Sequence, residues 1–302
     1  MRIWVVCPCF FDTASFRRVR EEALVALRSA APNAEVTFVL VDDTAGQDHA
    51  VPDVAALPDV QVIAPPYNLG HQGALVYALR RLGDTVRDDD FIVTMDSDGE
   101  DQPADLAALL APLLSDPDNV HKVSLARRTR RHEGLAFKTF YAVFKLVFRT
   151  LTGTVIRSGN FVAYRGWLLN EVIHHPHFDH CYSSSFISLP MQTVPVPLAR
   201  GRRFAGRSHM GFGGLFVHGV RMLMPFGERI AARGIIVSAP ILVASVAALI
   251  ATMVLRANPM WPMFGVCFAT LTLGLCVLLF ATFSHSKARN LRGLQDGPRP
   301  PR

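Results

Sequence analysis

The most informative segment of the chain is Thr94-Met95-Asp96-Ser97-Asp98-Gly99-Glu100-Asp101-Gln102-Pro103. It follows the apolar run Phe91-Ile92-Val93, which is typical of a buried strand. Four carboxylates lie within six residues at the end of this strand, where they repel one another. A hard divalent cation among their oxygens would relieve that repulsion, so the segment predicts a metal site.

Two other interpretations of this segment have to be weighed. An EF-hand loop needs glycine at its sixth position, whereas Gly99 is the fourth residue counted from Asp96, so an EF-hand is excluded. A solvated acidic turn that caps a helix beginning near Pro103 fits the residues as well as a metal site does. The segment by itself leaves the metal site and the capping turn open.

Short apolar runs alternate with helical patterns on both sides of this segment. Strands are predicted at residues 3–7, 36–41, 60–63, 91–95 and 120–126, and helices at 17–29, 73–82 and 104–114. This alternation indicates an α/β fold with a mostly parallel sheet and helices on both faces. Ligands of such sheets bind beyond the carboxyl ends of the strands. Those ends carry polar segments at 8–12, 42–43, 68–73, 96–101 and 127–128.

Hydrophobic residues make up 50% of the chain, and many of them are concentrated toward its C-terminal end. Residues 234–256 and 262–284 are apolar runs long enough to cross a hydrocarbon core of about 30 Å. Residues 257–261 form the turn between them, with Trp261 typical of a membrane interface. Neither run has a polar stripe, which argues against two buried helices of a soluble core. We therefore predict two transmembrane helices.

Basic residues are concentrated before and after this predicted hairpin. They are Arg200, Arg202, Arg203, Arg207, Arg221, Arg229 and Arg233 before it, and Lys287, Arg289, Arg292, Arg299 and Arg302 after it. The positive-inside rule then places both termini in the cytoplasm, on a cell inner membrane. No signal peptide is expected, because residues 1–6 lead straight into a strand. The formal charge of +6 follows from these flanks, and no nucleic-acid-binding motif accompanies it.

Two further segments have amphipathic patterns. Residues 135–151 contain four phenylalanines and no acid, with Lys138, Lys145 and Arg149 at helical spacing. Residues 211–233 lead into the first predicted span with a similar pattern. We expect both segments to lie in the membrane interface; for the first, a core helix with a solvated basic face is the alternative.

Cysteine and histidine residues do not form a recognisable metal motif. The five cysteines have no pair at metal-ligand or disulfide spacing, and are expected to be ordinary small apolar residues in a reducing cytoplasm. The histidines between residues 174 and 180 have no pair at helical spacing with a supporting acid. We expect this histidine segment to be a surface loop.

Five motifs follow one another along the chain. They are Val6-Cys7-Pro8-Cys9-Phe10-Phe11-Asp12, Val41-Asp42-Asp43-Thr44, Asn68-Leu69-Gly70, Asp96-Ser97-Asp98 and Arg203-Phe204-Ala205-Gly206-Arg207-Ser208-His209. In this order they resemble the inverting glycosyltransferases of family two, which have the GT-A fold. With the C-terminal hairpin, the chain looks most similar to the membrane-anchored branch that includes dolichyl- and polyprenyl-phosphate sugar transferases.

The resemblance implies a metal-dependent reaction with a nucleotide-sugar donor. Asp96 and Asp98, with Glu100, would hold Mg²⁺ or Mn²⁺ against the diphosphate leaving group. Arg127 follows a strand where the family has an arginine near the transferring phosphates, and Arg203 would close over them. Asp98, Arg127 and Arg203 are therefore the predicted catalytic residues.

The resemblance also implies a nucleoside site. Pro8, Phe10 and Asp12 would line the base and ribose, and Asp42 would hydrogen-bond to the nucleoside. His209 stands where the family has lysine at the diphosphate, so its charge depends on pH near neutrality.

Asn160 differs from the residue that the family usually has at this position, and the difference bears on the class of acceptor. It lies in Ser158-Gly159-Asn160-Phe161, where relatives commonly have Gly-Asp-Phe, and an asparagine cannot accept a proton. A polyprenyl phosphate is already ionised at neutral pH, whereas a hydroxyl acceptor needs a base. Asn160 therefore favours a phosphate acceptor, with Asp12, Asp101 and Asp179 left as candidate bases.

The predicted protein has a GT-A catalytic domain at residues 1–210 and an amphipathic juxtamembrane segment at 211–233. Transmembrane helices at 234–256 and 262–284, a loop at 257–261 and a basic cytoplasmic tail at 285–302 follow. Its predicted reaction transfers a sugar to polyprenyl phosphate at the cell envelope. The alternatives are a lipid hydroxyl or glycan acceptor, and a non-catalytic membrane partner that binds nucleotide sugar. The sequence leaves open whether the chain forms a homo-oligomer.

Overall fold

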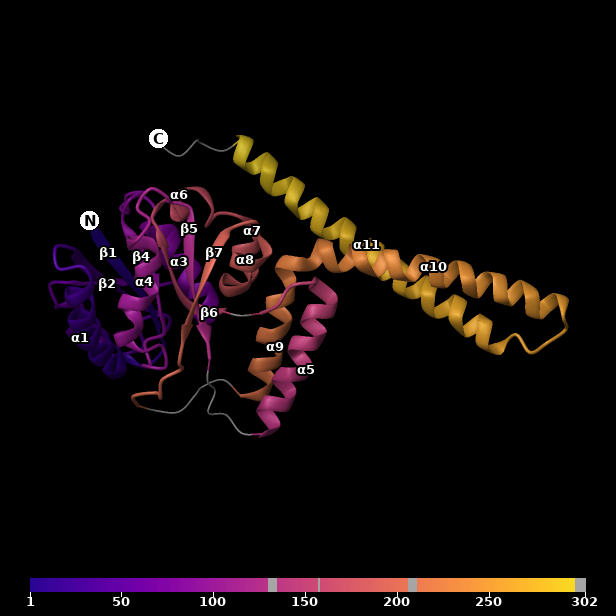
Figure 1. The fold of residues 1–302 in the computed structure, drawn as a ribbon, viewed down its shortest axis with the longest axis horizontal. Coiled ribbons are helices and arrows are strands. Elements are labelled where there is room, and N and C mark those ends of the chain that lie inside the picture. The colour runs from indigo at the N-terminus through magenta and orange to yellow at the C-terminus, as the bar shows by residue number, and fades with distance from the viewer. Residues whose placement is uncertain (130–134, 157, 206–210, 297–302) are drawn as a thin grey trace. The chain divides into compact units, whose positions relative to one another are not determined.

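A computed structural model describes residues 1–129, 135–156, 158–205 and 211–296. The chain divides into two compact units, Met1–Phe144 with Val155–Pro225 and Lys145–Thr154 with Phe226–Arg302. Figure 1 labels the main elements. The strands are β1 (Arg2–Cys9), β2 (Glu35–Asp42), β3 (Val60–Ile63), β4 (Phe91–Thr94), β5 (Lys122–Arg128), β6 (Ser158–Arg165) and β7 (Gln192–Leu198). The helices are α1 (Thr13–Ala30), α2 (Val51–Ala55), α3 (Gly70–Leu82), α4 (Leu106–Leu114), α5 (Leu135–Thr152), α6 (Trp167–Glu171), α7 (Pro176–His180), α8 (Tyr182–Ser188), α9 (Phe212–Leu223), α10 (Gly227–Val254) and α11 (Met260–Asp296), with 3₁₀ turns η1 (Pro103–Asp105) and η2 (Met224–Phe226).

The strands form one sheet in the order β3-β2-β1-β4-β6-β5-β7. Neighbouring strands are parallel except at β6, which runs antiparallel to both β4 and β5. The predicted α/β fold with a mostly parallel sheet is confirmed. Strands β6 and β7 were not predicted. Pro195 and Pro197 lie within β7, and this strand is at the edge of the sheet, where proline is tolerated.

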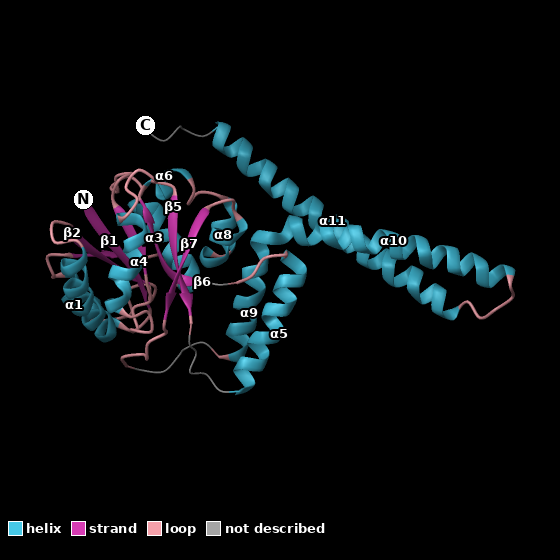
Figure 2. Cartoon of the chain, in the orientation of Figure 1, coloured by secondary structure: helices cyan, strands magenta, loops and turns pink. Residues whose placement is uncertain are grey.

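Both faces of the sheet are buried. In β1, Ile3 and Val5 pack in the core formed with α1 and α4, whereas Trp4 and Val6 pack on the opposite face with α3 and α8. Successive side chains of a strand point to opposite faces, so a strand that is covered on both faces is apolar throughout. Figure 2 shows helices on both sides of the strands. This packing fixes the parallel strands β1, β2 and β4, whose carboxyl ends carry the predicted site.

Phe16 of α1 supports a prediction about stability. Its side chain is fully buried and its ring packs edge-to-face on Phe38 of β2, with 6.5 Å between centroids. Phe16→Ala is expected to cost about 3–5 kcal/mol, because it removes this contact and leaves a cavity. A melting temperature about 10 °C lower should result, measured by differential scanning fluorimetry in detergent. Val25→Ala is the matched control, since Val25 of the same helix is 72% exposed; equal shifts in the two variants would contradict the described packing.

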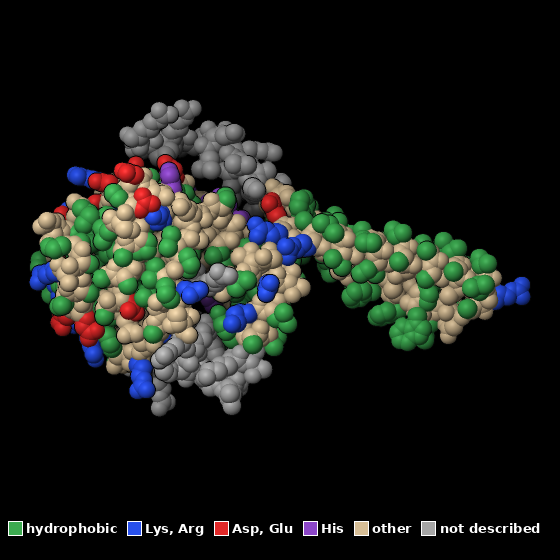
Figure 3. All heavy atoms as spheres, viewed as in Figure 1, with side chains coloured by type: hydrophobic (Ala, Val, Ile, Leu, Met, Phe, Trp, Pro, Cys, Tyr) green, Lys and Arg blue, Asp and Glu red, His purple; other side chains and the backbone are tan. Residues whose placement is uncertain are grey.

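The C-terminal unit is built around two apolar helices. Two segments are long and apolar enough to cross a membrane, Gly213–Val254, which contains α10, and Met260–Ser284, which is the first part of α11. Helices α10 and α11 approach closely at small residues: a Cβ added to Gly234 would lie 2.2 Å from Cys276 Sγ, and one added to Gly265 would lie 2.6 Å from Ser245 Oγ. Figure 3 shows hydrophobic side chains over the surface of this hairpin.

The helices of the hairpin extend beyond the predicted spans. Helix α10 begins at Gly227 rather than at residue 234. Helix α11 begins at Met260, within the predicted loop 257–261, and continues to Asp296, within the predicted tail 285–302. Helix α10 ends at Val254, two residues before the end of its predicted span. The backbone is therefore helical before the first apolar run and on both sides of the second.

The prediction of a surface loop in the histidine segment is wrong for residues 176–180. These residues form the short helix α7, with Pro176 in its first turn. Proline is favoured at that position because its missing N–H is one that the helix would leave unpaired. His175 precedes the helix, and its Nδ1 accepts a hydrogen bond from the His177 backbone nitrogen at 3.2 Å.

Candidate active site

The acidic loop, residues 96–101, follows β4 at the centre of the sheet. Carboxylate oxygens of Asp96, Asp98 and Glu100 lie within 4.8 Å of one another. Gly99 turns the loop with a φ of 86°, and a Cβ at this position would lie 2.7 Å from the Phe204 ring. Only glycine meets both requirements, so Gly99 allows the carboxylates to converge.

The acidic loop has the properties of a divalent-metal site. Asp96 Oδ1 is buried and accepts no hydrogen bond from the part of the chain that is described; it lies 3.1 Å from His71 Nε2 as an ion pair. Burial and the charge of Asp96 raise the pKa of Asp98 to about 6 and that of Asp101 to about 7. Converging oxygens with excess negative charge suit Mg²⁺ or Mn²⁺. Asp96, Asp98 and Glu100 therefore fit the implied metal.

A second segment, residues 199–204, runs along the acidic loop, and we call it the strap. Its backbone donates two hydrogen bonds to the loop, from Gly201 N to Glu100 O at 2.8 Å and from Phe204 N to Asp98 O at 2.8 Å. The strap is thereby held next to the carboxylates of the acidic loop. It connects β7, one of the strands that the sequence did not predict, to the candidate site.

The strap brings two arginines to the acidic loop. Arg200 forms an ion pair with Glu100. Arg203 reaches two acids, with Nη2 2.6 Å from Asp98 Oδ2 and Nη1 3.1 Å from Asp12 Oδ2. The structure thus places the predicted catalytic residue Arg203 in the candidate site, together with Asp12.

Strand β5 brings a different arginine to the acidic loop from the one predicted. Arg128 Nη2 lies 3.1 Å from Asp101 Oδ1 and 4.0 Å from Asp96 Oδ2, whereas the Arg127 side chain is exposed. Neighbouring side chains in a strand point to opposite faces, so only one of two adjacent arginines can face the acids. The structure therefore places Arg128, and not the predicted Arg127, beside the acidic loop.

Two of the predicted nucleoside-binding residues, Pro8 and Phe10, lie at the carboxyl end of β1 and directly after it. Pro8 O accepts a hydrogen bond from Ser97 Oγ at 2.9 Å, which ties the end of β1 to the loop. Phe10 is 37% exposed, and its ring packs edge-to-face on Phe11 with 4.9 Å between centroids. Phe11 has a φ of 56°, a strained conformation for a bulky side chain.

Asp42 has a structural role in its own turn. Its carboxylate is buried and accepts hydrogen bonds from Thr44 N at 3.1 Å and from Gly46 N at 3.2 Å. Asp43 connects this turn to the Asn68-Leu69-Gly70 motif, because its Oδ1 accepts from Leu69 N at 2.7 Å. His209, the remaining predicted residue, lies outside the described residues.

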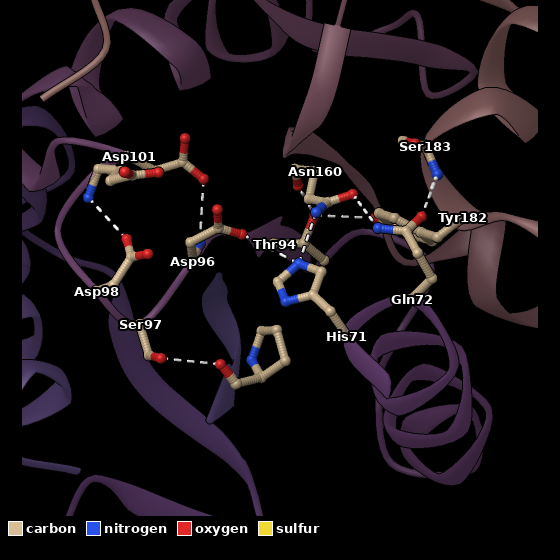
Figure 4. Close-up of polar contacts among 12 residues, drawn as sticks. His71, Gln72, Thr94, Asp96, Ser97, Asp98, Asp101, Asn160, Tyr182 and Ser183 are labelled. Atoms are coloured by element: carbon tan, nitrogen blue, oxygen red, sulfur yellow. Dashed lines mark hydrogen bonds and ion pairs between the residues drawn. The ribbon is translucent and has the colours of Figure 1, made fainter. Parts of the chain in front are cut away.

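His71 is a candidate site residue that the sequence analysis missed. It follows Asn68-Leu69-Gly70 at the start of α3, and its Nε2 lies 2.5 Å from Asn160 Nδ2 and 3.1 Å from Asp96 Oδ1 (Figure 4). Burial lowers the pKa of His71, but the charges of Asp96, Asp101 and Asp98 outweigh it and raise that pKa. The sequence signal that could have identified His71 is its position directly after the Asn68-Leu69-Gly70 motif, which follows the strand at residues 60–63.

The family follows from a comparison of the whole chain with known families. The model of glycosyl transferase family 2 matches residues 8–172, more than half of the chain. The chain belongs to glycosyl transferase family 2. It is a nucleotide-sugar transferase with the GT-A fold, as the motifs predicted. The matched region includes the acidic loop, Arg128, His71 and Asn160.

Several solved structures are similar to this chain at low identity. The structure of 4-diphosphocytidyl-2C-methyl-D-erythritol synthase is 14% identical with a TM-score of 0.42, covering 74% of this chain and 98% of that one. Residues 1–349 of S. aureus TarS are 14% identical with a TM-score of 0.39, covering 80% and 66%. The galactosyltransferase LgtC is 19% identical with a TM-score of 0.30, covering 55% and 58%. No curated protein matches the chain.

Proposed function

We propose that this glycosyltransferase moves a sugar, with inversion, from a nucleotide-diphosphate donor to a phosphate-bearing membrane lipid such as polyprenyl phosphate. The observation that carries the acceptor class is Asn160, whose Nδ2 lies 2.5 Å from His71 Nε2, next to Asp96 of the acidic loop (Figure 4). An amide at this position donates hydrogen bonds and takes up no proton. An acceptor that is already ionised matches it.

Donor binding in this proposal depends on the acidic loop and its arginines. Asp96, Asp98 and Glu100 would hold Mg²⁺ or Mn²⁺, which when bound neutralises the diphosphate leaving group. Arg128 is oriented by its ion pair with Asp101, and Arg203 is positioned by the strap. We assign both guanidinium groups to the diphosphate, where planar donors bind phosphate oxygens well.

The chemical step is a single displacement. A phosphate oxygen of the acceptor forms a bond to the anomeric carbon while the bond from that carbon to the donor diphosphate breaks. The electron pair leaves with the nucleoside diphosphate, and no proton has to be removed from the acceptor. Positioning of the two substrates and neutralisation of the leaving group supply most of the rate acceleration.

The location at a membrane is supported by apolar surface outside the sheet. Apolar side chains are exposed on α5 at Val143, Leu146 and Val147, and on α9 at Phe216 and Val217. Such surfaces fit helices that lie in the membrane interface. With the basic flanks, they support a catalytic domain on the cytoplasmic side of the inner membrane.

The test is a transfer assay with detergent-solubilised protein. Labelled nucleotide sugars are supplied one at a time with Mn²⁺ or Mg²⁺, and polyprenyl phosphate or the matched polyprenol is the acceptor. Label is expected in the organic phase with polyprenyl phosphate only, and EDTA should abolish it. Nuclear magnetic resonance of the product then gives the anomeric configuration. Equal transfer to polyprenol would contradict the phosphate acceptor, and donor binding without transfer to any acceptor would favour a non-catalytic partner.

A further inference from the structure

Gln72 of α3 has a side chain whose orientation is determined by the backbone. Its Oε1 accepts a hydrogen bond from Ser183 N at 3.0 Å, and a second from Cys181 Sγ at 3.4 Å. A backbone N–H can only donate, so the oxygen of the Gln72 amide must face Ser183. The Gln72 nitrogen therefore points the other way, toward the candidate active site.

The orientation of Gln72 determines that of Asn160. Gln72 Nε2 donates to Asn160 Oδ1 at 2.6 Å, so Asn160 Nδ2 faces His71 (Figure 4). The backbone of Asn160 is held as well, because its carbonyl accepts from Thr94 Oγ1 at 2.6 Å. Asn160 thus presents an amide nitrogen, which only donates, to His71 Nε2 at 2.5 Å.

This arrangement leaves His71 two suitable states. A neutral ring accepts the Asn160 hydrogen bond at Nε2 and carries its proton on Nδ1. A charged ring carries protons on both nitrogens and directs Nε2–H at Asp96 Oδ1, 3.1 Å away. A proton on Nε2 sets two donors opposite each other, 2.5 Å apart. The charged ring offsets this with a full ion pair to Asp96, whereas the neutral ring with its proton on Nε2 has only a hydrogen bond to Asp96 and is disfavoured. Nδ1 therefore carries a proton in both states, and the donor does not depend on the charge of the ring.

The Nδ1 donor of His71 is available to a ligand. Within the described residues Nδ1 takes part in no hydrogen bond, and the His71 side chain is 32% exposed. The His71 ring lies beside Asp96, at the edge of the acidic loop to which the proposed function assigns phosphate groups. A permanent N–H donor suits an anionic oxygen, and it cannot take a proton from a hydroxyl acceptor.

We propose that His71 is a substrate-binding residue whose Nδ1–H donates a hydrogen bond to an ionised phosphate oxygen, with Gln72 and Asn160 as the residues that position it. The phosphate is either the monoester of the lipid acceptor, which rests on the proposed function, or the diphosphate of the donor. Both sources offer the same oxygen chemistry, and binding experiments separate them.

Two substitutions at residue 71 separate the two ring nitrogens. The amide nitrogen of asparagine lies at the same number of bonds from Cα as histidine Nδ1, and that of glutamine at the same number as Nε2. His71→Asn therefore retains a donor at the Nδ1 position, whereas His71→Gln and His71→Ala lose it. His180→Gln, at an exposed histidine on α7, controls for loss of a histidine elsewhere.

Binding to the detergent-solubilised variants is measured by isothermal titration calorimetry. The probes are farnesyl phosphate, farnesol, and whichever of UDP, GDP, ADP and CDP binds wild type best with Mn²⁺. His71→Gln and His71→Ala are expected to weaken one phosphate probe about tenfold or more, as for a lost hydrogen bond to a charged group. His71→Asn should stay within about threefold of wild type, and farnesol binding should not respond.

The pattern of results decides the proposal and the ligand. Weaker farnesyl phosphate binding assigns His71 to the acceptor, and weaker nucleotide binding assigns it to the donor. Equal binding by His71→Gln and wild type, equal loss in His71→Asn and His71→Ala, or no phosphate binding by wild type would each overturn the proposal. If these binding results are as expected but no donor supports transfer, the proposed function fails while the assignment of His71 stands.

A second measurement, the tautomer of the His71 ring determined by nuclear magnetic resonance, tests whether Gln72 positions Asn160 and His71. In protein labelled with ¹⁵N-histidine, the His71 signal is assigned by its absence from His71→Gln. A neutral ring at high pH should show its proton on Nδ1 in wild type. Gln72→Glu still accepts from Ser183 N but cannot donate to Asn160, so Asn160 should turn and the proton should move to Nε2. An unchanged tautomer in Gln72→Glu would contradict the role of Gln72.

Discussion

Replacement of Asp98 by asparagine is expected to lower sugar transfer by about 10³-fold or more with the fold intact. The substitution removes one of the three carboxylates that converge within 4.8 Å and that we propose as the metal ligands. A bound metal contributes several kcal/mol to neutralising the leaving group, and about 4 kcal/mol corresponds to three orders of magnitude in rate. Asparagine keeps an oxygen for the hydrogen bond from Glu100 N, 2.8 Å from Asp98 Oδ1 in the wild type.

The same variant has an expected effect on stability with a definite sign. Burial and the Asp96 charge raise the pKa of Asp98 to about 6, so the ionised form is disfavoured in the metal-free folded protein. The stabilisation that this shift represents is present below the ordinary pKa and is lost as the pH rises through 6. At pH 7.5 the neutral asparagine should therefore melt no lower than wild type without metal.

Thermal melting with and without Mn²⁺, next to the transfer assay, checks both effects of Asp98→Asn. Wild type should gain melting temperature on adding Mn²⁺, and the variant should lose that gain. Undiminished transfer in Asp98→Asn would show that the acidic loop is not the metal site of the reaction. A large fall in its metal-free melting temperature would instead show that Asp98 is needed for folding.

Removal of Arg128 should reduce transfer about 10²-fold, whereas removal of its neighbour Arg127 should change transfer less than about threefold. Arg128 forms ion pairs with Asp101 and Asp96 of the acidic loop, where the donor phosphates are assigned, whereas the Arg127 side chain is exposed. Only Arg128 therefore lies where a preorganised positive charge can stabilise the negative charge that develops on the leaving group.

Arg127→Ala is the matched control for Arg128→Ala, since the two variants lose the same charge from adjacent positions of one strand. The values of kcat/KM for the donor are compared at one metal concentration. A greater loss in Arg127→Ala would restore the assignment made from the sequence and contradict the described geometry. Arg128→Lys should recover only part of the activity, because an ammonium group lacks the planar pair of donors.

Much of the fold was predictable because its signals are local. Strands β1 to β5 are apolar runs, and the helices between them are amphipathic, so each is visible in a short window of sequence. The acidic loop was predictable for the same reason, since Asp96, Asp98 and Glu100 lie close together in the chain. The family assignment rested on such short motifs and was confirmed.

The elements that were missed depend on their neighbours. Strand β6 is antiparallel and pairs with β4 and β5, so its place in the sheet is not visible from its own residues. Strand β7 contains two prolines that argue against a strand unless it lies at an edge. The strap that follows β7 then brings Arg200 and Arg203 to the acidic loop.

The amino-acid sequence alone predicted the α/β class, the acidic motif after β4, the glycosyltransferase family and two helices apolar enough for a membrane. These follow from patterns of neighbouring residues, which reflect local backbone preferences and burial. Tertiary structure was required to choose Arg128 over Arg127 and to find the contact of His71 with Asn160. Gln72, Asn160 and Ser183 are far apart in the chain, and only the packing of α3, β6 and α8 brings the Asn160 amide to Nε2 of His71.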